Sequence, residues 1–93
     1  KAVSEFKVDV RDYLDILAVW YRDVLYFKAT NDANGIIFRE NLRAIQEQTR
    51  CISYEGIERI LEGIQKARTR LTANVNFELT MELLFLLIKE NGE

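Results

Sequence analysis

Apolar side chains recur every three or four residues along most of the chain, which is the spacing of one face of an α-helix. Few stretches alternate between apolar and polar residues with the period of two that is typical of a strand. Proline is absent and there are only four glycines, so little interrupts the helical pattern. The sequence therefore predicts an all-α fold, a compact bundle of four to five helices, with its main helices over residues 4–29, 39–50, 53–73 and 77–89.

The first of these helices carries apolar residues on two sides. One stripe contains Phe6, Val10, Leu14, Leu17, Tyr21 and Val24. A second stripe contains Tyr13, Ile16, Trp20 and Phe27. A surface helix normally buries one stripe about 100° wide, so the two stripes predict that this helix packs on two sides.

Part of this helix is a candidate for a subunit interface. The candidate residues are Tyr13, Trp20, Arg22, Asp23 and Phe27. Tryptophan and tyrosine are frequent among the residues that dominate binding at interfaces. Arg22 and Asp23 would add an ion pair to a neighbouring subunit. The alternatives are that Trp20 fills the core of the domain and that the two charges form local pairs at its surface.

Polar residues mark the ends of the expected helices. Ser4, Ser53 and Asn76 are expected to be N-caps, because a side-chain oxygen at this position accepts a hydrogen bond from a free N–H group of the first turn. Asn74 is expected to end the third helix, since asparagine adopts left-handed backbone dihedrals at low cost. The short segment between the third and last helices predicts that these two are close neighbours in space.

The clearest break in the helical pattern is the segment from Thr30 to Gly35. Asparagine, aspartate and glycine dominate it, and these residues favour turns over helix. Three apolar residues, 36–38, follow the break directly. We expect them to form a short apolar plug that docks against an end of the bundle.

The last expected helix is apolar nearly all round. One face contains Phe77, Met81, Leu84, Phe85 and Ile88, and much of the rest is filled by Leu79, Leu83, Leu86 and Leu87. The residues left to face water are Glu78, Thr80, Glu82 and Lys89. A helix of this kind is either central to its bundle or covered by another chain.

Length and charge narrow the classes of function. The chain has 93 residues, the length of one domain, and we expect residues 1–93 to form a single domain. A formal net charge of -2 gives no overall attraction to nucleic acid or to an anionic membrane. Weak candidates for phosphate contacts are Lys66, Arg68 and Arg70, although cations near a helix C-terminus are already stabilised by the helix dipole.

No catalytic apparatus is visible in the sequence. There is no histidine, which is the commonest general base and metal ligand, and the scattered glycines form no phosphate-binding loop. Cys51 is the single cysteine, so we expect a small, partly buried residue in a reducing, cytoplasmic setting. We expect no enzymatic activity, no cofactor, no metal site, no small-molecule substrate and no membrane-spanning segment. Because the chain begins with Lys1, we interpret it as a piece of a longer protein.

Three stretches of the chain together form a recognisable pattern. They are Trp20-Tyr21-Arg22-Asp23-Val24-Leu25 with Lys28, the apolar plug at 36–38, and Arg70-Leu71-Thr72-Ala73-Asn74-Val75-Asn76 followed by Leu79, Glu82 and Leu83-Leu84. The pattern resembles the C-terminal domain of the delta-prime subunits of bacterial DNA polymerase III clamp loaders, over nearly the whole chain. Phe77 departs from it, since proline is common at this position in the family, so the start of the last helix is less firmly set.

The resemblance implies a role in assembly. Two AAA+-type domains would lie upstream, and five C-terminal domains would pack into a closed collar that holds a pentameric ring together during ATP-driven loading of the sliding clamp. The partners would be delta and gamma/tau collar domains, which are similar enough that the choice among the subunits stays open. DNA would be contacted only indirectly, through the complex. The alternatives are a small helical nucleic-acid-binding module and a ligand-binding regulatory bundle.

Overall fold

Four α-helices and two short 3₁₀ helices make up the part of the chain that the structure describes. The structure is a computed structural model that describes residues 2–73 and 76–92, and within these ranges it describes side chains from residue 12 onward. None of the described residues lies in a strand, so the prediction of an all-α fold is confirmed. The elements are α1 (Ala2–Thr30), η1 (Ala33–Gly35), η2 (Arg39–Asn41), α2 (Leu42–Cys51), α3 (Tyr54–Thr72) and α4 (Phe77–Gly92).

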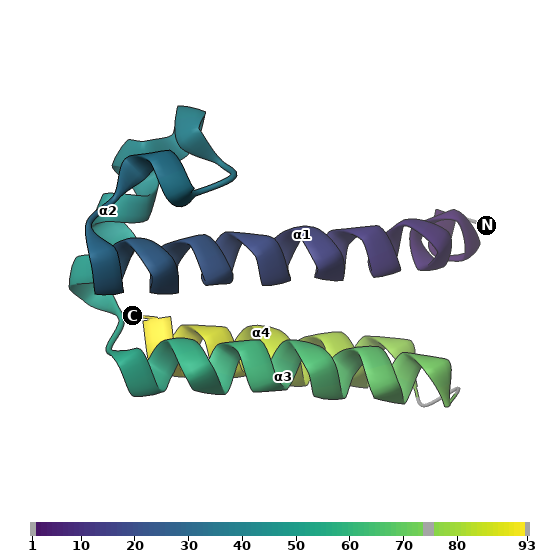
Figure 1. The fold of residues 1–93 in the computed structure, drawn as a ribbon. Helices are drawn as coiled ribbons and strands as arrows, with labels where there is room; N and C mark the ends of the chain where they lie inside the picture. Colours follow the sequence, from purple (N-terminus) through teal and green to yellow (C-terminus); the bar gives the residue numbers. More distant parts are fainter. Residues whose placement is uncertain (1, 74–75, 93) are drawn as a thin grey trace.

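The three long helices α1, α3 and α4 lie roughly side by side, and α2 lies at the end of the bundle where α1 finishes (Figure 1). α3 packs extensively against both α1 and α4. α3 and α4 run in opposite directions, so the end of α4 returns to the start of α3 (Figure 1). The central helix is therefore α3, and α4 lies at the edge of the bundle. The sequence predicted that the last helix is either central to the bundle or covered by another chain, and the first of these two alternatives is wrong.

The core lies where the long helices meet. α3 supplies a regular stripe of fully buried isoleucines, Ile57, Ile60 and Ile64, spaced by three and four residues. Leu14 and Val24 of α1 are also fully buried. Each such side chain contributes about 1.5–3 kcal/mol relative to an exposed one. Because this stripe occupies the inner face of α3, the outer face of that helix is left to charged and polar residues.

Side-chain caps stand at the start of the last two helices. Ser53 Oγ accepts a hydrogen bond from Gly56 N–H at 3.0 Å, and Ser53 is the N-cap of α3. Asn76 Oδ1 accepts one from Leu79 N–H at 2.8 Å, at the start of α4. Both bonds satisfy N–H groups that a helix cannot pair within its own first turn. Asn74 lies outside the described residues.

Several helix ends differ from the sequence prediction, among them the start of α2, because the first three residues of the helix predicted over 39–50 form η2. α1 begins at Ala2, ahead of Ser4, so Ser4 lies within the first turn and is not the N-cap. α4 continues to Gly92, past its predicted end at residue 89. An apolar repeat defines the middle of a helix, whereas its terminal residues depend on caps and on contacts at the ends. For Gly92 such a contact exists, because it approaches the side chain of Ile52.

The break after α1 is built by turn residues, as the sequence predicts. Asn31 adopts the left-handed region with φ 57°. Asp32 then caps η1, because its Oδ1 atom accepts a hydrogen bond from Asn34 N–H at 3.0 Å. The apolar plug that follows is only partly buried. Ile36 is in the core with 2% of its surface exposed, but Ile37 faces solvent with 71% exposed.

Candidate subunit interface

Asp23 is a structural residue inside the domain and not a free interface charge. It is buried on α1, with 4% of its surface exposed. Its Oδ2 atom accepts hydrogen bonds from Ile37 N–H at 3.0 Å and Phe38 N–H at 2.8 Å. A buried carboxylate needs such partners, and here they fasten the apolar plug to α1. The structure does not favour Asp23 as an ion-pair partner for a neighbouring subunit, because the carboxylate is buried and already accepts two hydrogen bonds within the domain.

Lys28 joins three helices at the same end of the bundle. Its Nζ atom donates a hydrogen bond of 2.7 Å to Thr49 O in the last turn of α2, where the helix dipole favours a cation. The same Nζ lies 5.0 Å from the ring centroid of Tyr54, a cation–π distance. The Tyr54 hydroxyl donates in return to Lys28 O at 2.9 Å. The Asp and Lys of the first recognisable stretch thus hold the fold together.

The second apolar stripe of α1 is divided into a covered and an open half. Phe27 is buried, and Trp20 is half-buried with its ring centroid 5.5 Å from that of Phe38. Nearer the N-terminus, Tyr13 is 43% exposed and Ile16 is 54% exposed. Of the aromatic candidates, Phe27 therefore belongs to the core and Trp20 mainly packs on the plug. Tyr13 remains accessible to a partner.

Tyr13 also marks the place where α1 reaches α4. Its ring centroid lies 6.5 Å from that of Phe85, in an edge-to-face arrangement.

Tyr21 is buried in the core, and this burial, with a smaller effect of the Tyr13 charge, raises the pKa of the Tyr21 phenol. Arg22 is exposed on α1 and remains a candidate for contact with a partner.

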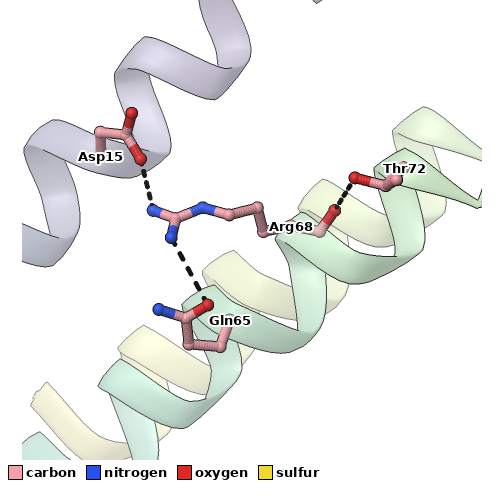
Figure 2. Close-up of polar contacts among 4 residues, drawn as sticks. All are labelled: Asp15, Gln65, Arg68 and Thr72. Atoms are coloured by element: carbon pink, nitrogen blue, oxygen red, sulfur yellow. Dashed lines mark hydrogen bonds and ion pairs between the residues drawn. The ribbon is translucent and has the colours of Figure 1, made fainter.

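The three candidate phosphate-binding cations have different environments. Arg68 reaches from α3 to α1, where one guanidinium nitrogen forms an ion pair with Asp15 (Figure 2). Its other terminal nitrogen donates to Gln65 Oε1 at 3.4 Å (Figure 2). Arg68 is thus engaged with other residues of the domain. Lys66 and Arg70, by contrast, are exposed on the outer side of α3.

α4 presents three leucines to solvent along one side. Leu79, Leu83 and Leu86 are 51%, 44% and 51% exposed. Their spacing of four and three residues places them in one row, which we call the outer leucine stripe. Leu84, on the opposite side, is in the core. Thr80 is also buried, which overturns the expectation that it faces water. The sequence showed the apolar surplus of this helix, yet the three leucines were not among the interface candidates.

A groove of about 240 Å³ lies between α3 and α4, next to this stripe. It is lined by Gly63, Lys66, Ala67, Arg70, Thr80, Leu83, Leu84 and Leu87, and we call it the α3–α4 groove. Gly63 leaves room for the side chain of Leu87 between the two helices, because a Cβ atom at this position would collide with Leu87 Cδ2. Its apolar floor and its two cations give the groove a mixed character that suits a protein side chain better than a catalytic reaction.

Other kinds of site are not supported by the described residues. Among the side chains that the structure describes, at residues 12–73 and 76–92, no group of three or more His, Cys, Asp or Glu could hold a metal ion. In the same part of the chain, no helix has both the length and the apolar character to cross a membrane. Cys51 is exposed at the end of α2, which corrects the expectation that it is partly buried.

Comparison with known families identifies the family of this helical domain. The family described as "DNA polymerase III, delta subunit, C terminal" matches residues 2–90, and the chain belongs to this family. Among curated proteins, DNA polymerase III subunit delta' of Bacillus subtilis (strain 168) is 29% identical to it over 77 residues. That match covers 83% of this chain and 23% of the relative, so the chain spans about a quarter of the relative's length. No solved structure matches.

These matches confirm the resemblance seen in the sequence. The chain is the C-terminal domain of a clamp-loader subunit of DNA polymerase III and belongs to DNA replication. This region of the subunit is not catalytic, so the chain itself is not an enzyme.

Proposed function

We propose that the chain is a collar domain of the delta-prime type, which holds the subunits of a clamp loader in a ring while the sliding clamp is loaded. Family membership supports an assembly role, and the outer leucine stripe supports it from the side of the structure. A row of three leucines left about half exposed on an edge helix is a feature that a covering partner explains. The stripe is the observation that carries the proposal.

The size of the apolar surface agrees with a ring held at several points. Fully burying an exposed leucine contributes about 1.5–3 kcal/mol, so covering the remaining half of three leucines contributes roughly 3 kcal/mol. Micromolar affinity requires about 8 kcal/mol. The stripe alone would therefore give a weak contact, and the ring would be stabilised by further contacts and by the avidity of linked domains.

The proposal extends to the parent protein. AAA+-type domains upstream of this one would couple ATP to clamp loading, and the partners would be the delta and gamma/tau subunits. DNA would be contacted through the complex, in the cytoplasm. The sequence upstream of this domain in the same gene tests this part of the proposal. Two AAA+-type domains are expected there, and an upstream region of any other type would contradict it.

The test of the assembly role is co-elution with delta and gamma/tau C-terminal domains of the same organism, measured by size exclusion with light scattering. Leu83→Glu places a charge in the middle of the outer leucine stripe. Ile37→Glu is the matched control, because Ile37 is also an exposed apolar residue but lies in the plug between α1 and α2. Trp20→Ala is a poorer probe, since Trp20 packs on Phe38 within the domain.

The expected result is a complex with the wild-type chain and with Ile37→Glu, and its loss with Leu83→Glu. Far-UV circular dichroism checks that each variant remains folded. Equal binding by Leu83→Glu and the wild type would show that the stripe is not the contact. No complex between the intact parent subunit and any other clamp-loader subunit would refute the assembly role itself.

A further inference from the structure

We propose that the outer leucine stripe and the α3–α4 groove form one seat for an amphipathic helix of a neighbouring clamp-loader subunit, with acidic side chains of that helix above Lys66 and Arg70. This inference rests on the proposed function, because it names the surface and the partner chemistry through which the domain would join its neighbour. Three features of the surface support it: a continuous apolar strip, a hollow beside that strip, and charges of opposite sign on its two edges.

The apolar strip and the hollow share a residue. Leu83 is the middle member of the outer leucine stripe and also lines the α3–α4 groove, together with Leu87. The groove volume of about 240 Å³ exceeds the roughly 150 Å³ of an apolar cavity that holds benzene. It therefore admits one leucine or phenylalanine side chain. A helix lying along the stripe would place such a residue in the groove once and pack small or aliphatic residues elsewhere.

The two edges of the strip carry opposite charge. On the α3 side, Lys66 and Arg70 are exposed and one helical turn apart, and both line the groove. On the other side, Glu78 and Glu82 each precede a leucine of the stripe by one position, which places them on its far edge. None of these four side chains has an ion-pair partner among the described residues.

This charge arrangement specifies the occupant. A helix seated on the stripe meets cations on one edge and anions on the other, so it binds best with acidic side chains on the first edge and basic ones on the second. Nucleic acid is disfavoured, because its phosphates would lie beside Glu78 and Glu82 and against exposed leucines. Thr80 also lines the groove, but its hydroxyl is buried, so the groove offers an occupant mainly apolar contacts and the two cations.

The experiment measures the affinity of the intact subunit that carries this domain for the intact delta and gamma/tau subunits, by isothermal titration calorimetry. The test variant is the double charge reversal Lys66→Glu/Arg70→Glu. The control is Arg39→Glu/Arg43→Glu, which changes the net charge equally at two exposed arginines of η2 and α2. Matching the net charge separates a local contact from long-range electrostatic steering.

The expected result is a rise in Kd of about tenfold or more for the test variant, and less than about twofold for the control. A single Asp→Lys or Glu→Lys change on the partner should restore binding to the test variant. Equal effects of the two double variants, or no effect of either while wild-type subunits bind, would overturn the inference and leave the proposed function standing. Absence of binding between wild-type intact subunits would overturn both.

Two further outcomes would replace the partner. If light scattering shows a wild-type dimer that the test variant loses, with subunit binding unchanged, the occupant of the seat is a second copy of this chain. If the test variant loses affinity for a primed duplex, again with subunit binding unchanged, Lys66 and Arg70 contact phosphate. Either result would refute the partner helix.

Discussion

Replacing the buried Asp23 with alanine should destabilise the domain strongly. The change removes the acceptor of two hydrogen bonds, from Ile37 N–H and Phe38 N–H. A buried N–H group left without a partner costs about 1–3 kcal/mol, and both bonds here are only partly buried, so the expected loss is roughly 2–4 kcal/mol. A domain of 93 residues has a total stability of roughly 5–14 kcal/mol. Asp23→Ala should therefore remove at least about a seventh of it, and most of it if the domain is only marginally stable.

Urea denaturation followed by circular dichroism measures this loss. Asp23→Asn should cost about half as much, because it keeps an uncharged acceptor oxygen in the same place. Asp12→Ala is the control, since it removes an exposed carboxylate from the same helix and should change stability by less than about 0.5 kcal/mol. Hydrogen exchange should show lost protection at the amides of Ile37 and Phe38. A stability of Asp23→Ala within about 0.5 kcal/mol of wild type would refute the structural role of this carboxylate.

Three other experiments test the packing and electrostatics of the bundle. Burial raises the pKa of the Tyr21 phenol from its usual value of 10.0. As the pH rises past that value, the unfolded chain therefore releases the phenol proton more readily than the folded domain, and the stability of the fold falls. Tyr21→Phe should reduce this loss of stability, measured by urea denaturation between about pH 9 and 11. Gly56→Ala should lower the free energy of unfolding in urea by about 1 kcal/mol, because a Cβ atom 3.0 Å from the backbone oxygen of Asn91 costs more in overpacking than alanine gains over glycine in helix propensity. An unchanged or higher stability would contradict this. Arg68 and Asp15 are partly exposed, so a double-mutant cycle to alanine should give a coupling below about 1 kcal/mol that shrinks with salt; a larger, salt-independent coupling would argue against a screened surface pair.

The sequence predicted those features that depend on local periodicity. The isoleucine stripe of α3 and the serine cap at Ser53 follow from residues three or four positions apart, and both are found in the structure. The internal contacts of Asp23 and Lys28 could not be predicted from the sequence, because their hydrogen-bond partners lie 14 or more residues away and only the folded chain brings them together. The sequence therefore made Asp23 a candidate for a subunit interface, whereas in the structure it makes hydrogen bonds within the domain.

The candidate interface also combines a feature that the sequence predicted with one that depends on the folded structure. The apolar surplus of the last helix was visible in the sequence, but its exposed side depends on which helix is central. Thr80 illustrates this, since its polarity suggested solvent and its position on the inner side of α4 buries it. Once Met81 and Leu84 are known to lie in the core, the helical repeat places Leu79, Leu83 and Leu86 outside.

The location of the internal polar contacts explains how an edge helix keeps so much apolar surface. Asp23 and Lys28 fasten the apolar plug and the end of α2 to α1, and neither contact involves α4. The domain therefore holds its remaining parts in place without using the outer side of α4, which attaches to the bundle through its inner side alone. A partner that covers the stripe would not have to displace any of these contacts. We accordingly expect assembly to proceed by rigid docking of a preformed surface, with little change in the backbone of this domain.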